Sequence, residues 1–362
     1  MKYIITISIV LLSLYSKGQE GSSQEIYGVF LYEKAYEQLE CMLKDSCELS
    51  FKEAVFVVEN AYLNERLDKE YFELQIQSLI SLAEGVKNSR TLLYQGEDRS
   101  EIEKYASIFS VICDTLPIQS GDSIVYRNPY SYDFNDVWGN QNWGNMFVSK
   151  LLETGKGNCH SLPYLYKILA EELDAKAHLA IAPNHFYIKH HSKTLGWFNT
   201  ELTSAEFPID AWLMASGYIH LDAVVNRLYM EALTDKQAIA ICLIDLAKGY
   251  ERRYGVGDGL FLLRCVNTAL EHYPNYINAL LLKSEMMRKQ FFAMMNENHA
   301  KHPSEVFQIP EAKLKFDEME VLIGQIHTLG YRKMPQEMYL EWLASLKEER
   351  EKYANKKLSN FK

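Results

Sequence analysis

The chain has 362 residues, of which 48% are hydrophobic, 12% aromatic and 24% charged. These proportions are those of an ordinary globular protein, and the length is sufficient for two or three domains. The net charge of -10 argues against non-specific nucleic-acid binding, which needs a basic face, and it gives no reason for a polybasic membrane contact. We therefore expect neither nucleic acid nor, in the mature chain, a membrane as a partner.

Residues 1–18 have the pattern of a secretory signal peptide. Lys2 supplies a positive start, and the apolar run "YIITISIVLLSLY" is short for a bilayer span. Ser16 and Gly18 are small residues before an expected cleavage point. The alternative is an uncleaved N-terminal anchor. The segment predicts an exported protein, either periplasmic or secreted.

The chain has six cysteines, but a chain of this size does not need disulfides to make a core. Only Cys41 and Cys47 are close in sequence, and they are the one plausible bridge. We expect most of the other thiols to be buried. The remaining cysteines are Cys113, Cys159, Cys242 and Cys265.

Residues 19–130 predict a helical N-terminal region. The stretch "SFKEAVFVVENAYL" spaces its apolar residues at three and four, and Ser50 with Glu53 has the pattern of a capping box. The polar stretch "PIQSGDSIVYRNPYSYDFND" then interrupts this pattern. Its glycine and prolines indicate a loop or a domain boundary.

Residues 131–220 predict a mixed segment. A short helix ends at Gly155, and a second helix follows Cys159 with Pro163 in its first turn, where a missing N–H does no harm. Three strand-like runs come next: "AHLAIAP", "HFYIKHH" and "GWFNTEL". The order predicts a cysteine-bearing helix packed on a small antiparallel sheet.

Residues 221–362 predict helices again. The stretch "ALEHYPNYINALLLKSEMM" resembles tetratricopeptide repeats, in which a proline follows one helix and the next helix begins a few residues later. The two candidate equivalent positions, Ala238 and Ala279, lie further apart than the usual repeat of about 34 residues. We therefore call the region TPR-like, with an unrelated helical bundle as the alternative.

Chemistry is suggested by the stretch "GKGNCHSLP", which places Cys159 at a helix start. A helix N-terminus lowers the pKa of a thiol. His185 opens the second strand and offers an imidazole base. Asn199 and Glu201 lie on the third strand, and strand alternation places them on one face. Either side chain could orient the imidazole.

These residues resemble the core of the transglutaminase-like superfamily. The family pattern has G-x-C at a helix start, a His on a strand, and then W-x-x-x-D-x-T. Here it reads Gly157-Asn158-Cys159, His185, and the run from Trp197 to Thr203. The flanks are similar to a bacterial branch that joins this core to tetratricopeptide-like helices. The resemblance implies an α+β fold with a papain/transglutaminase-like core between two helical regions.

The resemblance also implies thiol chemistry on amide or ester carbonyls. Cys159 would be the nucleophile, His185 the general base, and a third residue would orient the imidazole. Glu201 stands where the family pattern has Asp, and we prefer it by register. Asn199 is the alternative, because an amide serves this role in papain-like enzymes.

Two residues of "VWGNQNWGN", Gln141 and Trp143, are candidates for holding an oxyanion, and aromatic packing under the helix is the alternative. His160 should face away from the thiol. His190 and His191 could join His185 in a weak metal site, but no zinc-ligand spacing accompanies them. We expect no metal and no cofactor.

Two functions remain open from the sequence. The first is an exported cysteine enzyme that hydrolyses or transfers peptide or isopeptide acyl groups, with the helical tail holding a protein or peptide partner. The second is a catalytically silent scaffold that binds protein partners through its TPR-like helices. The chain has no phosphate-binding glycine-rich loop or nucleotide fingerprint to support a kinase or a dehydrogenase.

Overall fold

The computed structural model describes residues 25–360, so the predicted signal peptide lies outside the described residues. A helix over residues 25–43 comes first. The helices that follow it are α2 (Phe51–Tyr62), α3 (Lys69–Ser89), α4 (Arg99–Cys113), α5 (Val148–Thr154), α6 (Ser161–Glu172), α7 (Asp210–Ser216), α8 (Leu221–Val225), α9 (Asp235–Tyr254), α10 (Leu260–His272), α11 (Ile277–Glu297), α12 (Pro310–Thr328) and α13 (Gln336–Asn360), with the 3-10 helices η1 (Trp143–Met146) and η2 (Pro303–Val306).

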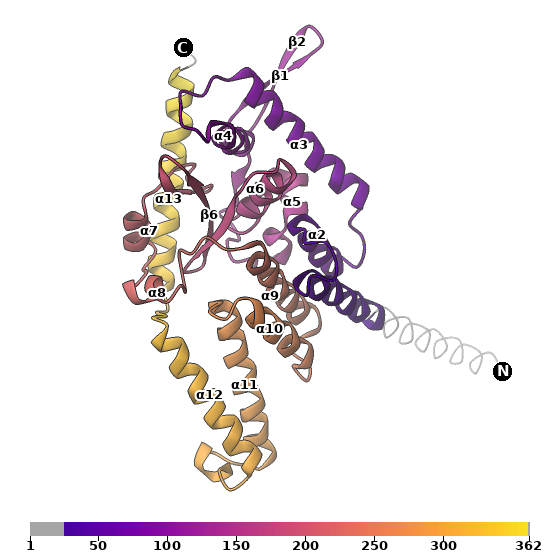
Figure 1. The fold of residues 1–362 in the computed structure, drawn as a ribbon. Helices are drawn as coiled ribbons and strands as arrows, with labels where there is room; N and C mark the ends of the chain where they lie inside the picture. The colour runs from indigo at the N-terminus through magenta and orange to yellow at the C-terminus, as the bar shows by residue number, and fades with distance from the viewer. Residues whose placement is uncertain (1–24, 361–362) are drawn as a thin grey trace, which may run out of the picture.

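The fold is mixed α+β and mostly helical, with small sheets in the middle of the chain (Figure 1). The main sheet has the order β5-β6-β7 and is antiparallel, which confirms the three predicted strands. The strands are β1 (Leu116–Ser120), β2 (Ser123–Arg127), β3 (Ser131–Tyr132), β4 (Lys156–Gly157), β5 (His178–Ala182), β6 (His185–Ser192) and β7 (Gly196–Thr200).

The polar stretch that interrupts the N-terminal helices is more ordered than a loop. It forms the antiparallel hairpin β1–β2, with Ser120 opposite Ser123. Gly121 has φ +59 in the turn, a conformation that glycine adopts without the clash a side chain would meet. The parallel pair β3–β4 follows and places Tyr132 opposite Gly157.

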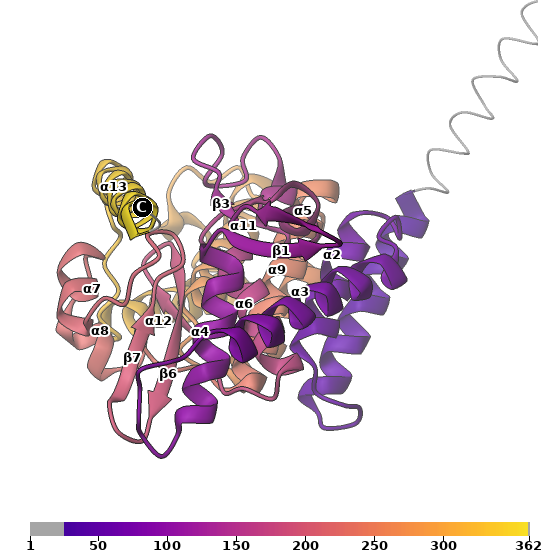
Figure 2. The same ribbon diagram turned by 90° about the horizontal axis from the view of Figure 1, so that it is seen from above.

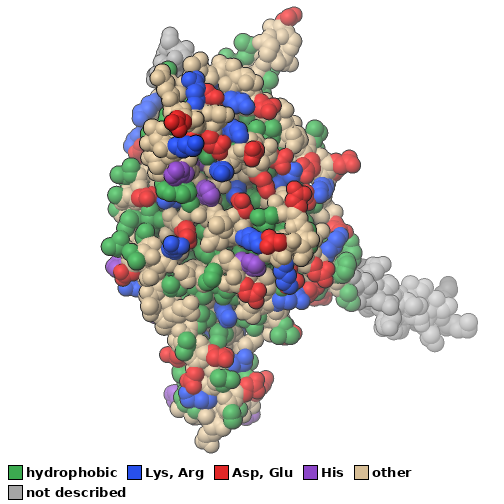
Figure 3. Space-filling view, viewed as in Figure 1, with side chains coloured by type: hydrophobic (Ala, Val, Ile, Leu, Met, Phe, Trp, Pro, Cys, Tyr) green, Lys and Arg blue, Asp and Glu red, His purple; other side chains and the backbone are tan. Residues whose placement is uncertain are grey.

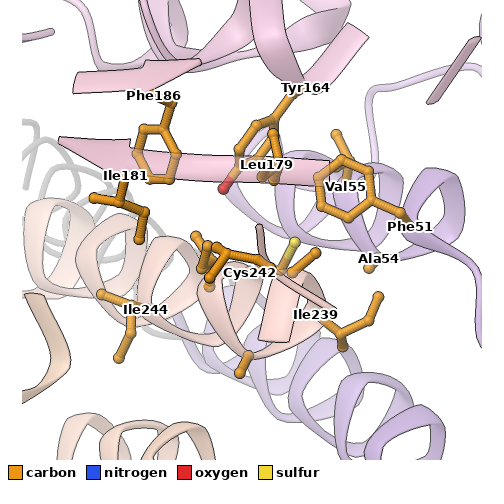
Figure 4. Packing of buried hydrophobic residues seen from close by; sticks show 14 of the residues in the cluster. Phe51, Ala54, Val55, Tyr164, Leu179, Ile181, Phe186, Ile239, Cys242 and Ile244 are labelled. Atoms are coloured by element: carbon orange, nitrogen blue, oxygen red, sulfur yellow. The ribbon is translucent and has the colours of Figure 1, made fainter. Parts of the chain in front are cut away.

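One apolar core joins the N-terminal helices, the sheet and the C-terminal helices. Figure 4 shows Phe51 from α2, Tyr164 from α6, Leu179 and Phe186 from the sheet, and Cys242 from α9 in contact with the same interior. Phe51 and Tyr164 pack edge to face, with ring centroids 5.0 Å apart. Because this core is continuous, the boundaries near residues 130 and 220 stay predictions.

The helices of the C-terminal region pack in succession, α9 against α10, α10 against α11 and α11 against α12. In Figure 1, α11 and α12 project from the rest of the molecule. Ala238 and Ala279 are both fully buried, as small residues at helix contacts should be. The identity of this region as tetratricopeptide-like stays a prediction.

The last helix, α13, leaves this succession and returns to the core beside α7 (Figures 1 and 2). Its buried residues Tyr339, Trp342 and Leu343 form a second apolar cluster. Trp138 and Trp212 pack against that cluster from the core side. The sequence predicts a further helix here, but its return over the middle of the chain is a feature of the tertiary structure.

The surface of the molecule and its pair of neighbouring cysteines have the following features. Side chains of both charge signs are interspersed with apolar ones on the face drawn in Figure 3. In the part of the chain that is described, no helix is both long and apolar enough to cross a bilayer. Cys41 and Cys47 are both thiols, and a hydrogen bond to Cys41 raises the pKa of Cys47 to about 11.

His190 is a buried core residue. It is 0% exposed, and its ring stacks on Tyr105 at 3.9 Å. Within residues 25–360 neither ring nitrogen makes a hydrogen bond of normal geometry, and burial lowers the pKa of His190 to about 3, although the backbone of Lys176 opposes the shift. His191 points to the other face of the sheet, where it meets Trp197. Among residues 25–360, no group of three or more His, Cys, Asp or Glu could hold a metal ion.

We expect His190 to make the protein sensitive to acid. Below the unfolded pKa of about 6.5, the unfolded chain binds a proton at this position and the folded chain does not. The free energy of unfolding should therefore fall by about 1.4 kcal/mol per pH unit as the pH falls from 6.5 toward 3. Urea unfolding at pH 7, 6 and 5 measures this slope. His190→Phe should reduce the slope, and His191→Phe is the exposed control. Identical slopes in wild type and His190→Phe would contradict the assignment.

Candidate active site

Hydrogen bonds between residues close in sequence shape the turn that carries Cys159. The Asn158 Oδ1 accepts the backbone N–H groups of His160 at 2.9 Å and Ser161 at 3.2 Å. The Ser161 Oγ in return accepts the backbone N–H of Asn158 at 3.0 Å. These contacts satisfy N–H groups at the start of α6 that would otherwise lack partners. They hold Cys159 two residues before the helix.

The same turn leaves little room for a side chain at Gly157. A Cβ at this position would lie 2.4 Å from Ser161 Oγ and 2.9 Å from a methyl group of Leu151. Neither distance is compatible with normal packing. The spacing G-x-C therefore has a local physical cause: the glycine makes room for the hydroxyl that braces the residue before the cysteine.

Cys159 is only 6% exposed. Its Sγ lies 3.7 Å from the carbonyl oxygen of Asn184 and 3.7 Å from the hydroxyl of Tyr339. Burial raises the pKa of the thiol, but a hydrogen bond and the charge of His185, with the hydroxyls of Tyr339 and Tyr132, lower it further than burial raises it. The net pKa of Cys159 is below that of an ordinary thiol.

His185 and Glu201 form a buried pair. The His185 Nε2 lies 2.6 Å from Glu201 Oε2, and each residue is 1% exposed. The His185 Nδ1 has no geometrically complete hydrogen bond, which leaves it as the nitrogen for Cys159. Burial alone would lower the pKa of His185, but the Glu201 carboxylate and Cys159 raise it to about 10. The arrangement favours a thiolate beside an imidazolium at neutral pH.

Glu201 is fixed from two sides. It follows β7, and its backbone exchanges hydrogen bonds of 2.8 and 3.0 Å with Glu206. Its second carboxylate oxygen, Oε1, accepts the backbone N–H of Thr203 at 2.8 Å. Both oxygens therefore have partners, so the carboxylate is held on the imidazole rather than free to rotate. The threonine of the W-x-x-x-E-x-T run contributes its backbone to this contact.

Asn199 faces a different part of the sheet. Its Nδ2 donates to Pro208 O at 2.9 Å and to Asp210 Oδ1 at 2.7 Å. The pairing of β6 with β7 sets Asn199 opposite Lys189, four residues along β6 from His185. Strand alternation puts Asn199 and Glu201 on one face, but register allows only Glu201 to meet the imidazole.

Gln141 and Trp143 lie in a loop held by Asp136. The Asp136 Oδ2 accepts the backbone N–H of Gln141 at 3.1 Å, and the Gln141 side chain is exposed. Trp143 is covered by the guanidinium of Arg252, 4.4 Å from the ring. Neither side chain has a hydrogen bond or ring contact with Cys159 among the described residues. The contact of Trp143 is with Arg252 of α9, and whether it serves as an oxyanion donor or as packing stays a prediction.

His160 points away from the thiol, as expected. Its Nε2 lies 3.2 Å from both carboxylate oxygens of Asp245, and its Nδ1 lies 2.9 Å from Met146 O. Tyr164 also donates to Asp245, at 2.7 Å. This group ties the start of α6 to α9 and is already fully engaged.

Three aromatic residues complete the site, and none belongs to the motif. Tyr132 on β3 has a buried hydroxyl that interacts with Cys159 both electrostatically and as a hydrogen-bond donor. Tyr339 on α13 donates to Asn184 O at 3.1 Å. The ring of Trp342 packs edge-on against His185 at 4.6 Å. Burial raises the pKa of both tyrosines, so both hydroxyls remain protonated donors.

The sequence does not predict these three aromatic contacts. Tyr339 and Cys159 are 180 positions apart, and no periodicity connects them. The place of Tyr132 follows from the two-residue strand pair β3–β4, which is too short to recognise as a pattern. Tyr339 and Trp342 close the site from the side of α13, and Cys159 is covered in this conformation.

We compared the chain with protein-family models, with curated proteins and with solved structures, and nothing matches.

Proposed function

We propose that this protein is an exported, transglutaminase-like cysteine enzyme that acts on peptide or isopeptide amide bonds by hydrolysis or acyl transfer. One observation supports the proposal above the others. A His185–Glu201 contact of 2.6 Å lies in a buried setting, with Cys159 next to the remaining imidazole nitrogen. A thiol, a base and a group that orients the base are the parts that nucleophilic acyl transfer needs. Export through residues 1–18 belongs to the same proposal.

The proposed reaction has two steps. The Cys159 thiolate attacks the amide carbonyl carbon and forms a C–S bond, and His185 donates a proton to the departing amine as the C–N bond breaks. Water or a second amine then attacks the thioester and gives its proton to His185. The C–S bond breaks and the thiolate returns. Glu201 keeps its charge throughout and stabilises the imidazolium.

The oxyanion that forms in each step needs a donor. Tyr132 is the described side chain best suited to this role, because its buried hydroxyl stays protonated and lies beside the Cys159 sulfur. Gln141 and Trp143 make no hydrogen bond or ring contact with Cys159 in the described part of the chain, and their observed contacts are with Asp136 and Arg252. The proposal therefore transfers the oxyanion role from these two residues to Tyr132.

The second candidate function is the catalytically silent scaffold that binds protein partners through the TPR-like helices. The coverage of the nucleophile supports it. Cys159 is 6% exposed, and Tyr339 and Trp342 lie over the thiol and the imidazole. A peptide reaches the sulfur only when α13 moves. If α13 never moves, the buried pair is a structural remnant.

An activated ester separates the two functions. Mature protein is mixed with p-nitrophenyl acetate at pH 6.5, and acetylated thiols are located by mass spectrometry. The enzyme predicts a burst of about one p-nitrophenol per chain, with the acetyl group on Cys159 and not on the exposed Cys47. Cys159→Ala should abolish the burst. Trp342→Ala is assayed in parallel so that coverage by α13 does not hide a competent thiol. Absence of Cys159 acetylation in both proteins would favour the scaffold.

A further inference from the structure

A cavity of about 660 Å³ lies beside the candidate site. Its walls come from the β5–β6 turn, from α9 and α11, and from the connector between α12 and α13. The volume is in the range of pockets that hold small ligands or a few residues of a peptide. The cavity therefore joins the cysteine-bearing core to the C-terminal helices.

The charged side chains that line this cavity are all basic. They are Arg252, Arg332 and Lys333, and no Asp or Glu lines it. Within residues 25–360, none of the three forms an ion pair, whereas the chain as a whole carries a net charge of -10. A local excess of unpaired positive charge in a concave site attracts anions.

Arg252 is held in position before any ligand arrives. Its guanidinium donates to Asn140 Oδ1 at 3.3 Å and lies over the Trp143 ring at 4.4 Å. These contacts use one nitrogen and one face of the guanidinium and leave donors for a carboxylate. The side-chain amides of Asn278 and Gln336 also line the cavity and match the hydrogen-bonding groups of a peptide.

The cavity adjoins the nucleophile. Asn184 lines it, and the carbonyl oxygen of Asn184 lies 3.7 Å from Cys159 Sγ. Trp138 also lines it and packs on Tyr339 at 4.5 Å, and the Tyr339 hydroxyl is the other neighbour of the sulfur. The cavity and the Cys159 thiol are therefore separated by Asn184 and Tyr339. Displacement of Tyr339 would open one continuous path.

We propose that this cavity binds the carboxylate groups of an acidic peptide segment and so selects substrates whose scissile bond lies next to such a segment. The inference rests on the proposed function, because it names the substrate class for the same site. Arg332 and Lys333 lie in the connector that leads into α13. A peptide bound to them contacts the segment that carries Tyr339.

Binding is tested on full-length mature Cys159→Ala protein, which removes any turnover. The probes are four fluorescent tetrapeptides of one length: a Gly-Glu-Glu-Gly amide, a Gly-Gln-Gln-Gly amide, the Gln peptide with a free C-terminal carboxylate, and a Gly-Lys-Lys-Gly amide. Anisotropy titrations are run at 50 and 200 mM salt. We expect the Glu peptide to bind about tenfold more tightly than the Gln amide, and less tightly at high salt. Tight binding of only the free-carboxylate peptide would overturn the acidic-segment inference and assign the carboxylate to a chain terminus.

The matched variants locate the effect. Arg332→Gln with Lys333→Gln should weaken binding of the Glu peptide about tenfold. Arg288→Gln with Lys301→Gln makes the same change in net charge outside the cavity and should leave binding within about twofold. Equal affinity for Glu and Gln amides, or equal losses in the two double variants, would overturn the inference. Loss of Cys159 acetylation with selective binding retained would instead count against the proposed chemistry.

Discussion

Replacing His185 by alanine should lower the rate at which Cys159 reacts with iodoacetamide at pH 6 by about 10- to 100-fold. In the wild type, His185 holds the pKa of Cys159 below that of an ordinary thiol. Without the imidazole, burial remains and raises the pKa of the thiol. The reactive thiolate fraction at pH 6 then falls by about tenfold for each unit of the rise.

The labelling rate of Cys159 should also change with pH in a defined direction. The lowered pKa of Cys159 keeps the wild-type thiolate reactive as the pH falls from 8 toward 6, and reactivity is lost when the pH falls through that pKa. The imidazolium persists until the pH rises through about 10. The ion pair therefore spans neutral pH. In His185→Ala, labelling should decline below about pH 8.5 or higher, as for an ordinary or buried thiol.

Labelling at pH 5 to 9 is measured site by site by mass spectrometry, with Cys47 as the internal exposed thiol. Glu201→Gln should give an intermediate loss, because the neutral amide stabilises the imidazolium less than a carboxylate does. His190→Phe is the matched control, since it removes another buried histidine of β6 that has no contact with the thiol in the described structure. A His185→Ala profile that coincides with the wild type would refute the thiolate–imidazolium pair.

Trp342→Ala should raise the labelling rate of Cys159 by about tenfold or more. Trp342 is 4% exposed and packs on His185, and removal of a buried indole costs about 3–5 kcal/mol. Much of this loss should weaken the docking of α13. Labelling that waits for α13 to open rises about tenfold for each 1.4 kcal/mol of lost docking energy.

A distant variant distinguishes opening from local damage. Arg350 anchors the far part of α13 by donating to Tyr130 O at 3.2 Å and Cys113 O at 3.4 Å. Arg350→Ala should also raise the labelling of Cys159, although it leaves the thiol's own neighbours in place. Trp197→Ala removes an indole that is 52% exposed and should have no effect. If hydrogen exchange in α13 accelerates while labelling of Cys159 stays constant, α13 is not the barrier.

Several features follow from short stretches of sequence because their physics is local. The cap that Asn158 and Ser161 form requires residues within three positions of one another, and the side chains of Ser161 and Leu151 leave little room for a Cβ at the glycine of G-x-C. The strand-like composition of "HFYIKHH" and the turn after it predict β6, and the helix after Cys159 follows from its apolar spacing. The motif order brings His185 into the same hypothesis as Cys159.

Short sequence patterns do not predict the register between strands or the direction in which a loop side chain points. Alternation leaves Asn199 and Glu201 equivalent, and only the pairing of β6 with β7 places Asn199 beside Lys189 and frees Glu201 for His185. Gln141 and Trp143 precede the cysteine helix, but Asp136 and Arg252 hold them elsewhere. A short sequence separation does not determine which way a side chain faces.

By itself, the sequence determined the mixed α+β class, the three central strands, and the placing of a cysteine at a helix start. Each depends on contacts between residues that are near in the chain, so periodicity and capping reveal them. Only the tertiary structure decided that α13 returns to cover Cys159, that Tyr132 reaches the sulfur, and that three basic side chains share one cavity. These arrangements join segments separated by many residues, and their geometry is set by packing of the whole core, which no local pattern encodes.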